Sequence, residues 1–448
     1  MRPNCNKPFP VSGLPFFYGW VILAAGIIGV LMSIPGQTMG VSVFTESLLS
    51  DLQINRNHLS LAYLVGTMGS GLMITRAGKL YDRHGARVMA FIAGVMLGVM
   101  LVYLTRVDRL VGALPEKSWV SPALLTFILL AFGFWGIRFF GQGLLTMVSR
   151  NMVMKWFNRR RGLANAVLGI FTALGFSVAP RILDQIIQRL AWKGAWIFLA
   201  ILVGIAFSLF VLLVFRDNPE ECGCQPDGRL GKMKQGRRPP SLPDHDFTLA
   251  EARKTLAFWA FTLGLFLSAL YISGLTFHVV SVFESSGLTR EQGLGIFIPT
   301  SLIAVGVQFL GGYASDYIRL KFLLLIFALG MTCSMLGLTL LGGSHGAYWM
   351  IIIGNGVVWG LYTVLIGVTW PRFYGLKHLG AISGLSLSWT VIGSALGPYM
   401  FSVSKDLTGS YHLVAWICFA ISLLVIAVSF KANNPGVPLL PDKNQGHD

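Results

Sequence analysis

Arg138 lies inside a stretch that is otherwise apolar, where a guanidinium could bind an anion. It precedes Arg150, the expected cytoplasmic end of its helix, by about twelve residues, so in a membrane it would lie roughly 18 Å deep. An arginine at that depth costs at least about 2.5–3.5 kcal/mol and therefore faces a cavity or a partner. No acidic residue lies at comparable depth, so we predict that Arg138 pairs with an anionic ligand, and Gln142 continues its helical face. Hydrogen bonds from Arg138 to backbone carbonyl groups are the alternative.

Two polar stripes in the second part of the chain could also contact a small ligand. Tyr271 and His278 are seven residues apart and share a helical face. With no buried carboxylate in mid-membrane, His278 is the candidate for proton coupling, although such a histidine can equally bond two helices together. Asn355, Trp359 and Tyr362 form a polar and aromatic stripe that could bind a ligand or simply pack.

The elements that carry these residues are predicted to be membrane helices. The chain is 54% hydrophobic and 12% charged, against about 25% charged in a soluble domain. A helix needs about 20 mostly apolar residues to cross the hydrocarbon core. Twelve runs meet this requirement, and they are called spans one to twelve: 18–43, 57–77, 87–106, 122–149, 160–185, 192–215, 255–283, 291–314, 320–341, 346–371, 378–402 and 410–430.

The predicted fold is an all-α membrane protein with twelve transmembrane helices in two six-helix halves. We expect a first half over 1–215, a cytoplasmic linker over 216–253, a second half over 254–431 and a cytoplasmic tail over 432–448. The halves are related, because at an offset of 218 residues Gly162 and Pro180 of span five match Gly380 and Pro398 of span eleven.

The distribution of Lys and Arg predicts the orientation. The side that would hold both termini and the linker collects about three times as many basic residues as the other. We therefore expect a multi-pass protein of the cytoplasmic (inner) membrane with both termini in the cytoplasm. The net charge of +16 fits basic cytoplasmic loops, and we expect no nucleic acid partner.

A charged loop between spans two and three reads Gly-Lys-Leu-Tyr-Asp-Arg-His-Gly-Ala-Arg from Gly78 to Arg87. A weaker copy begins at Gly312, 234 residues later. Glycines at such positions allow tight turns and close helix approach, and a carboxylate can accept hydrogen bonds from the first turn of a helix. Six residues form a candidate conformational latch: Gly78, Asp82, Arg83, Gly85, Arg87 and Asp316.

This loop resembles the cytoplasmic signature loop of the major facilitator superfamily. The resemblance implies a transporter whose two halves rock against each other, with the loop latching the cytoplasmic side in the outward-open state. A loop that only directs membrane topology is the alternative.

Two further stretches resemble the bacterial branch of monocarboxylate transporters and oxalate–formate antiporters: 17–20 (Phe-Tyr-Gly-Trp) and 155–164 (Lys-Trp-Phe-Asn-Arg-Arg-Arg-Gly-Leu-Ala). Carriers of that branch usually hold the substrate carboxylate with an arginine in span eight. Here Gln308 is the nearest match to that arginine, and hydroxyl groups including Thr390 line span eleven.

These observations predict a secondary transporter of a small organic anion, a mono- or dicarboxylate, by proton symport or anion exchange. The substrate-binding candidates are Arg138, Gln142, Tyr271, His278, Gln308, Asn355, Trp359, Tyr362 and Thr390. An efflux carrier for a larger amphipathic compound and a non-transporting receptor on the same fold are the alternatives. We expect no enzymatic activity, since no paired carboxylates, metal set or nucleophile–base pair shares a depth. We expect no cofactor, and a monomer in contact with membrane lipid.

Overall fold

The computed structural model describes residues 8–11, 13–54, 56–112, 121–227 and 245–435. In these ranges the chain forms helices and no strand. The middle of the predicted linker and most of the predicted tail lie outside the described residues.

Ten described helical segments are long and apolar enough to cross a membrane. Two of them, Leu61–Leu104 and Arg161–Val214, have 44 and 54 residues, far more than one crossing needs. Each contains one residue with non-helical backbone angles, Gly85 (φ 82°, ψ 174°) and Ala191 (φ 54°, ψ 168°). Counted as two spans each, they bring the total to the predicted twelve.

The first half contains spans one to six. Its helices are α1 (Gly19–Leu31), α2 (Thr38–Ser42), α3 (Thr45–Leu52), α4 (Arg56–Leu104), α5 (Val107–Gly112), α6 (Pro122–Ile137), α7 (Thr146–Trp156), α8 (Arg161–Ile201) and α9 (Ser208–Val214). Two π-helical segments, Arg138–Leu145 and Leu202–Phe207, join α6 to α7 and α8 to α9.

The second half contains spans seven to twelve. Its helices are α11 (Leu256–Ser285), α12 (Arg290–Gly295), α13 (Phe297–Ser315), α14 (Leu320–Thr339), α15 (His345–Tyr374), α16 (Leu379–Thr408) and α17 (His412–Ser429), and the short α10 (Leu249–Ala252) precedes them at the end of the linker.

Each half has its own apolar core. One cluster of buried side chains runs from Val11 to Cys222 and adds Val391, and the other runs from Phe247 to Ala432. Large apolar side chains such as Leu72, Ile298 and Leu302, each about 70% exposed, cover the outside, as expected for a surface in contact with lipid.

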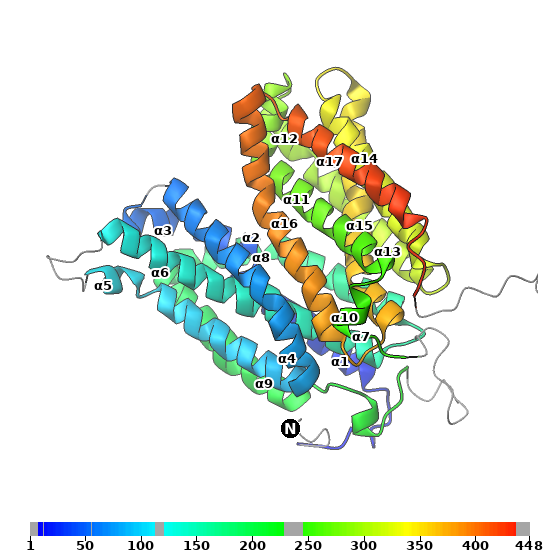
Figure 1. The fold of residues 1–448 in the computed structure, drawn as a ribbon. Coiled ribbons are helices and arrows are strands. Elements are labelled where there is room, and N and C mark those ends of the chain that lie inside the picture. Colours follow the sequence, from blue (N-terminus) through cyan, green and yellow to red (C-terminus); the bar gives the residue numbers. More distant parts are fainter. Residues whose placement is uncertain (1–7, 12, 55, 113–120, 228–244, 436–448) are drawn as a thin grey trace, which may run out of the picture.

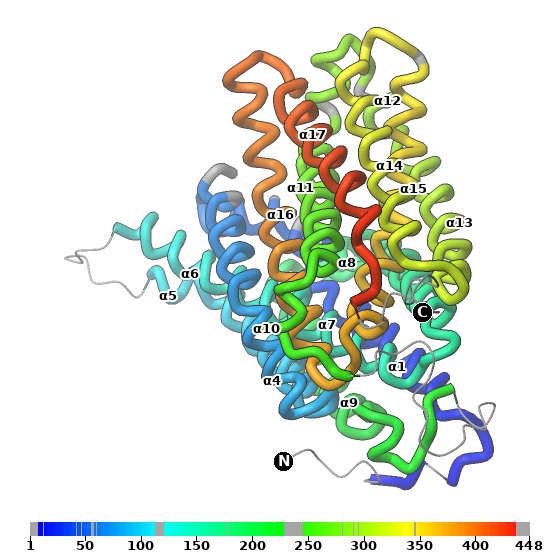
Figure 2. The backbone as a smooth tube through the Cα atoms, turned by 45° about the vertical axis from the view of Figure 1, so that its right-hand side comes forward, coloured from blue at the N-terminus to red at the C-terminus, as the bar shows by residue number. Residues whose placement is uncertain are grey.

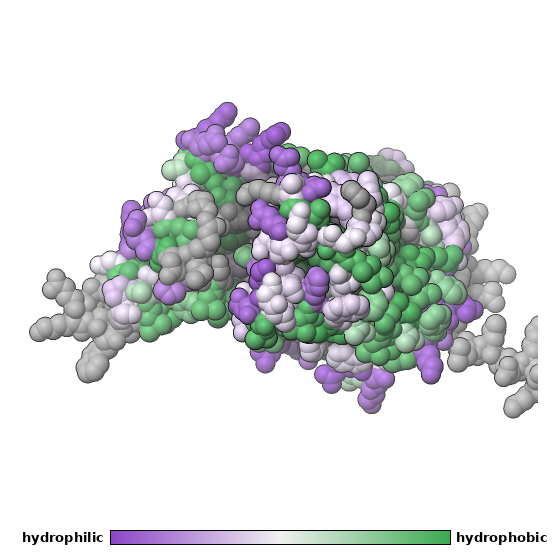
Figure 3. All heavy atoms as spheres, turned by 90° about the horizontal axis from the view of Figure 1, so that it is seen from above, coloured by the Kyte–Doolittle hydropathy of each residue, from purple (hydrophilic) through white to green (hydrophobic). Residues whose placement is uncertain are grey.

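The two bundles meet at one end and diverge toward the other (Figures 1 and 2). At the meeting end, α7 and α15 end, α8 and α16 begin, and Asp227 and Phe247 of the linker donate backbone hydrogen bonds to Trp156 and Tyr374. We call this end the linker face. Seen from the opposite end, the surface is hollowed between the two lobes (Figure 3).

Candidate functional site

Asp82 joins the two halves at the linker face. Its Oδ1 accepts a hydrogen bond from the Gly380 amide at 2.7 Å and its Oδ2 accepts one from the Ala381 amide at 2.8 Å. Gly380 and Ala381 belong to the first turn of α16, whose amides have no partner within the helix and whose dipole attracts an anion. The expected contact of this carboxylate with a helix start is therefore present, between α4 of one half and α16 of the other.

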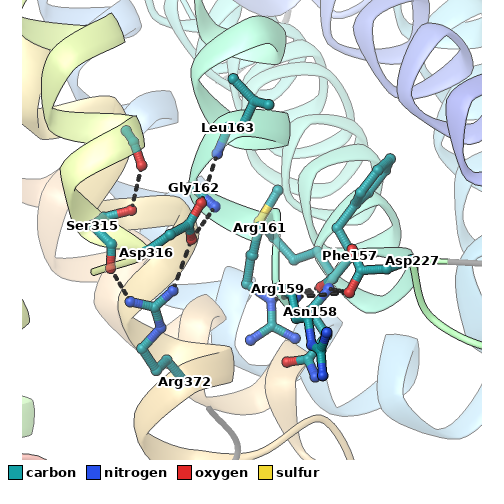
Figure 4. Close-up of polar contacts among 12 residues, drawn as sticks. Phe157, Asn158, Arg159, Arg161, Gly162, Leu163, Asp227, Ser315, Asp316 and Arg372 are labelled. Atoms are coloured by element: carbon teal, nitrogen blue, oxygen red, sulfur yellow. Dashed lines mark hydrogen bonds and ion pairs between the residues drawn. The ribbon is translucent and has the colours of Figure 1, made fainter. Parts of the chain in front are cut away.

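Asp316 makes the equivalent contact from the second half to the first (Figure 4). Its Oδ1 accepts from the Gly162 amide at 2.9 Å and its Oδ2 from the Leu163 amide at 3.3 Å, in the first turn of α8. Arg372 Nη2 forms an ion pair with Asp316 Oδ1 at 3.0 Å. Burial raises the pKa of the Asp316 carboxyl, while these amides and Arg372 act in the opposite direction.

Glycines bring the helices close enough for these contacts. A Cβ atom on Gly78 would collide with the carbonyl oxygen of Gly380, and one on Gly162 would collide with that of Gly312. The two crossings between the halves, α4 with α16 and α8 with α13, thus share the same arrangement. We call the two carboxylates, the two helix starts and these four glycines the gate.

Hydrogen bonds farther from the linker face also join the halves. Asn151 donates to Ser383 Oγ at 2.8 Å, Asn165 to the Thr363 carbonyl at 2.6 Å, and Gln308 to the Ala166 carbonyl at 3.0 Å. Gln308, predicted to bind substrate, therefore bonds span eight to span five beside Gly169. Together with the gate, these bonds close the linker face of the described structure.

The remaining latch candidates lie in the first half. Arg87 is buried and donates from Nε to the Phe215 carbonyl at 2.9 Å. Gly85 adopts the left-handed φ that favours glycine and packs on Asp217, and the Arg83 side chain is exposed. The structure thus places Arg87 and Gly85 where they fix the turn between spans two and three.

Arg138 begins the π-helical segment and is 1% exposed. Its Nη1 donates to the Gly36 carbonyl at 3.2 Å and to Thr38 Oγ1 at 3.1 Å, and its guanidinium lies 5.3 Å from the centre of the Tyr63 ring. Nη1 therefore forms the hydrogen bond to a backbone carbonyl that was the alternative to ligand binding. Nε and Nη2 are buried and have no partner among the described residues.

Arg150 was predicted to end span four, and this boundary is wrong. The helix does not end there but continues to Trp156, because the following residues Asn151 to Trp156 are all buried. The Arg150 guanidinium lies near Tyr362 of the second half, and the Tyr362 hydroxyl contacts Thr390. Arg150 Nη1 is buried without a hydrogen-bond partner in the described structure.

Two more substrate candidates have unsatisfied buried polar atoms, Gln142 Oε1 and Trp359 Nε1. Trp359 lies one helical turn before Tyr362 on α15, so both project from one face of that helix. Span four of the first half and span ten of the second thus both carry buried polar atoms that lack hydrogen-bond partners among the described residues.

Three predicted residues do not join this group. The Tyr271 hydroxyl is within hydrogen-bond distance of Ser334 Oγ at 3.0 Å, and Ser334 donates to Asn355 at 3.0 Å, so these contacts lie inside the second half. His278 Nε2 lies 3.0 Å from the Pro398 carbonyl, and its ring stacks on Phe401. Since a carbonyl only accepts, His278 donates here and bonds α11 to α16, which favours the packing role over proton coupling.

Comparison with known proteins agrees with this architecture. Residues 22–398 match the model of the Major Facilitator Superfamily. The chain is 22% identical to the hexuronate transporter of Bacillus subtilis over 90% of this chain and 92% of that protein. It is 20% identical to the probable L-galactonate transporter of Escherichia coli, covering 88% of this chain and 85% of that one.

The solved structure of the proton:xylose symporter XylE superimposes with a TM-score of 0.62 at 17% identity, covering 92% of this chain and 95% of that chain. At this identity the likeness bears on the fold alone. The narrower resemblance to monocarboxylate and oxalate–formate carriers is not confirmed, because these relatives are named for sugars and sugar acids.

Proposed function

Because the chain belongs to the major facilitator superfamily and is a secondary transporter rather than an enzyme, we propose that its substrate is a small organic anion. This anion is a mono- or dicarboxylate, a class that includes the sugar acids for which two relatives are named. Proton symport or anion exchange would drive the transport.

One observation carries the proposal: on span four, the buried Arg138 and the half-buried Arg150 both keep buried guanidinium nitrogens without hydrogen-bond partners. Arg138 has Nε and Nη2 unsatisfied, and Arg150 has Nη1 unsatisfied. In the described structure neither forms an ion pair with a carboxylate. Uncompensated buried charge is costly, so a carboxylate substrate that supplies the missing acceptor would be strongly favoured.

We assign the principal role to Arg150, with Tyr362, Thr390 and Trp359 facing it from the second half. A carrier must hold its ligand between two halves that move relative to each other, and Arg150 of the first half interacts electrostatically with Tyr362 of the second. Arg138, held by Gly36 and Thr38 within the first half, would attract the anion on its way in.

The gate gives this site access to one side at a time. With the linker face closed, the hollow between the two lobes lies at the opposite end (Figure 3). From the distribution of basic residues we propose that the linker face is cytoplasmic, that the membrane is the inner one and that this state faces outward. Breaking the gate contacts would let the halves rock to the inward-facing state.

A thermal-shift panel tests the substrate class, because a ligand that binds only the folded state raises its stability. D-Glucuronate, L-galactonate, L-lactate and oxalate form the anionic set, and D-xylose and L-fucose form the neutral set. We expect stabilisation by at least one carboxylate, and its loss in Arg150→Gln. Stabilisation by neutral sugars alone, or an unchanged shift in Arg150→Gln, would refute the proposal.

Uptake of the identified ligand into proteoliposomes separates a transporter from a receptor on the same fold. Stabilisation by larger amphipathic compounds, with no response to any carboxylate, would instead favour the efflux alternative.

A further inference from the structure

The two ends of the linker bind the two halves in the same way. At the entry, Asp227 Oδ2 accepts hydrogen bonds from the amides of Asn158 at 3.0 Å and Arg159 at 2.7 Å (Figure 4). At the exit, Asp246 Oδ1 accepts from the amides of Leu376 at 2.9 Å and Lys377 at 3.4 Å.

These contacts repeat with the internal duplication of the chain. Asn158 and Leu376 differ by 218 positions, as do Arg159 and Lys377. The backbone contacts beside them follow the same offset: Asp227 N donates to the Trp156 carbonyl at 3.2 Å and Phe247 N donates to the Tyr374 carbonyl at 3.0 Å. The linker thus forms the same contact with two turns that are equivalent in the repeat. The two linker residues, Asp227 and Asp246, are not themselves separated by the 218-residue offset.

The turns that the linker holds lead directly into the gate. Asn158 and Arg159 lie four residues before Gly162 and Leu163, whose amides donate to Asp316. Leu376 and Lys377 stand in the same relation to Gly380 and Ala381, which donate to Asp82. Each helix start therefore receives two carboxylates, one from the linker and one from the opposite half.

The first amides of a helix point along its axis, so the turn before the helix sets where they point. Asp316 and Asp82 need two amides each at hydrogen-bond distance, and such contacts weaken steeply with misalignment. A turn that is free to move would present these amides in many orientations, and closing the gate would then also have to order the turn.

We propose that Asp227 and Asp246 are positioning residues of the gate, which hold the starts of α8 and α16 ready for Asp316 and Asp82. The linker thereby sets the balance between the closed and open linker face. This rests on the gate role proposed above for Asp82 and Asp316.

The test measures the distance between labels on the two halves, at the exposed residues Lys79 and Arg319, in lipid nanodiscs. The labels are introduced as unnatural amino acids, because Cys224, Cys333 and Cys418 are free thiols that would also react. Asp227→Ala and Asp246→Ala should each raise the ratio of open to closed molecules about five-fold, the usual effect of losing one helix-capping contact.

Pairs of substitutions distinguish positioning from general weakening. Asp227→Ala should add little to Asp316→Ala, because both act through the start of α8, but it should multiply the effect of Asp82→Ala. Asp246→Ala should add little to Asp82→Ala, because both act through the start of α16, but it should multiply the effect of Asp316→Ala. Asp227→Asn, which keeps an acceptor oxygen, should restore most of the closed population.

Glu251→Ala is the matched control. Glu251 belongs to the same linker and caps α10 through Thr248. It interacts electrostatically with His378 beside the second turn but forms no hydrogen bond with either turn in the described structure, so it controls for the loss of a nearby carboxylate and the distance distribution should not change.

Two outcomes would overturn the inference, and they are distinguishable. If Asp82→Ala and Asp316→Ala leave the distances unchanged, the gate itself is wrong and the positioning role falls with it. If those two variants open the face but Asp227→Ala and Asp246→Ala do not, or if all pairs are equally additive, only the positioning role is wrong. Thermal unfolding of each variant identifies those that no longer fold, and for these the Asn variants supply the comparison.

Discussion

Substitution of Gly78 by alanine should open the linker face. A Cβ at this position would collide with the backbone of Gly380. Because the Cβ is fixed to the backbone of α4 and the atoms it meets belong to the backbone of α16, the two helices must move apart by on the order of 1 Å. Overpacking of this kind costs about 1–3 kcal/mol. The same displacement stretches the hydrogen bonds that Asp82 accepts at 2.7 and 2.8 Å, each worth about 1.5–3 kcal/mol when the acceptor is charged.

Stretching loses only part of the hydrogen-bond energy, so we expect a total of about 3 kcal/mol, which would shift the ratio of closed to open molecules on the order of 100-fold. The open state is unaffected, because the two helices are apart there. The higher helix propensity of alanine acts in both states and cancels. Distances between labels at Lys79 and Arg319 measure the shift directly.

Gly306→Ala is the matched control, because Gly306 lies within α13, where a Cβ would meet nothing within 4 Å. It should leave the distribution unchanged. If Gly78→Ala also leaves it unchanged, the close approach of α4 and α16 does not limit closure, and the reasoning is wrong.

Three further predictions follow from the contacts described. Arg150→Gln should weaken carboxylate binding on the order of 100-fold. Arg138→Gln should weaken binding less and should also lower thermal stability, because Arg138 donates hydrogen bonds to Gly36 and Thr38. Equal effects of the two variants on binding would contradict the assignment. His278→Gln should retain accumulation driven by a pH gradient in proteoliposomes, because the amide can still donate to Pro398; loss of accumulation with intact substrate exchange would make His278 the proton carrier. Burial raises the pKa of the Asp316 carboxyl in the closed state, so the closed state binds the proton more tightly than an open state in which the carboxyl is hydrated. Acidification from pH 8 to 5 should therefore favour closure, as measured by the distances between the labels. Asp316→Asn should remove the contribution of this carboxyl to the pH dependence.

The twelve spans could be predicted because one physical requirement dominates their sequence. A helix must bury about 20 residues in hydrocarbon, and apolar runs of that length are hard to mistake. The predicted run at 320–341, for example, corresponds to α14 at Leu320–Thr339. The clear error in these boundaries is at span four, where Arg150, Asn151 and Lys155 made a helical stretch look like a loop. Asn151 donates a hydrogen bond to Ser383 of the opposite half and Lys155 pairs with Asp217, and hydropathy cannot register such partners.

The gate was partly accessible from sequence. The position of Asp82 in a Gly-rich loop predicted that it would accept hydrogen bonds from a neighbouring helix start, but the loop does not specify which helix that is. The 218-residue repeat could have indicated it, because Gly162 and Gly380 were already matched as equivalent positions, and these two glycines donate to Asp316 and Asp82.

Residues of the candidate substrate site were harder to choose, because polarity within a span does not reveal what the side chain faces. Tyr271, Asn355 and His278 satisfy their polar atoms within the second half, as buried groups usually do. Arg150, Trp359 and Gln142 retain unsatisfied buried atoms, and that difference depends on tertiary packing. Since an unsatisfied buried donor carries a cost that evolution normally removes, its persistence at the interface of two moving halves is the stronger argument for a ligand there, and it points to Arg150 ahead of the residues chosen by their spacing alone.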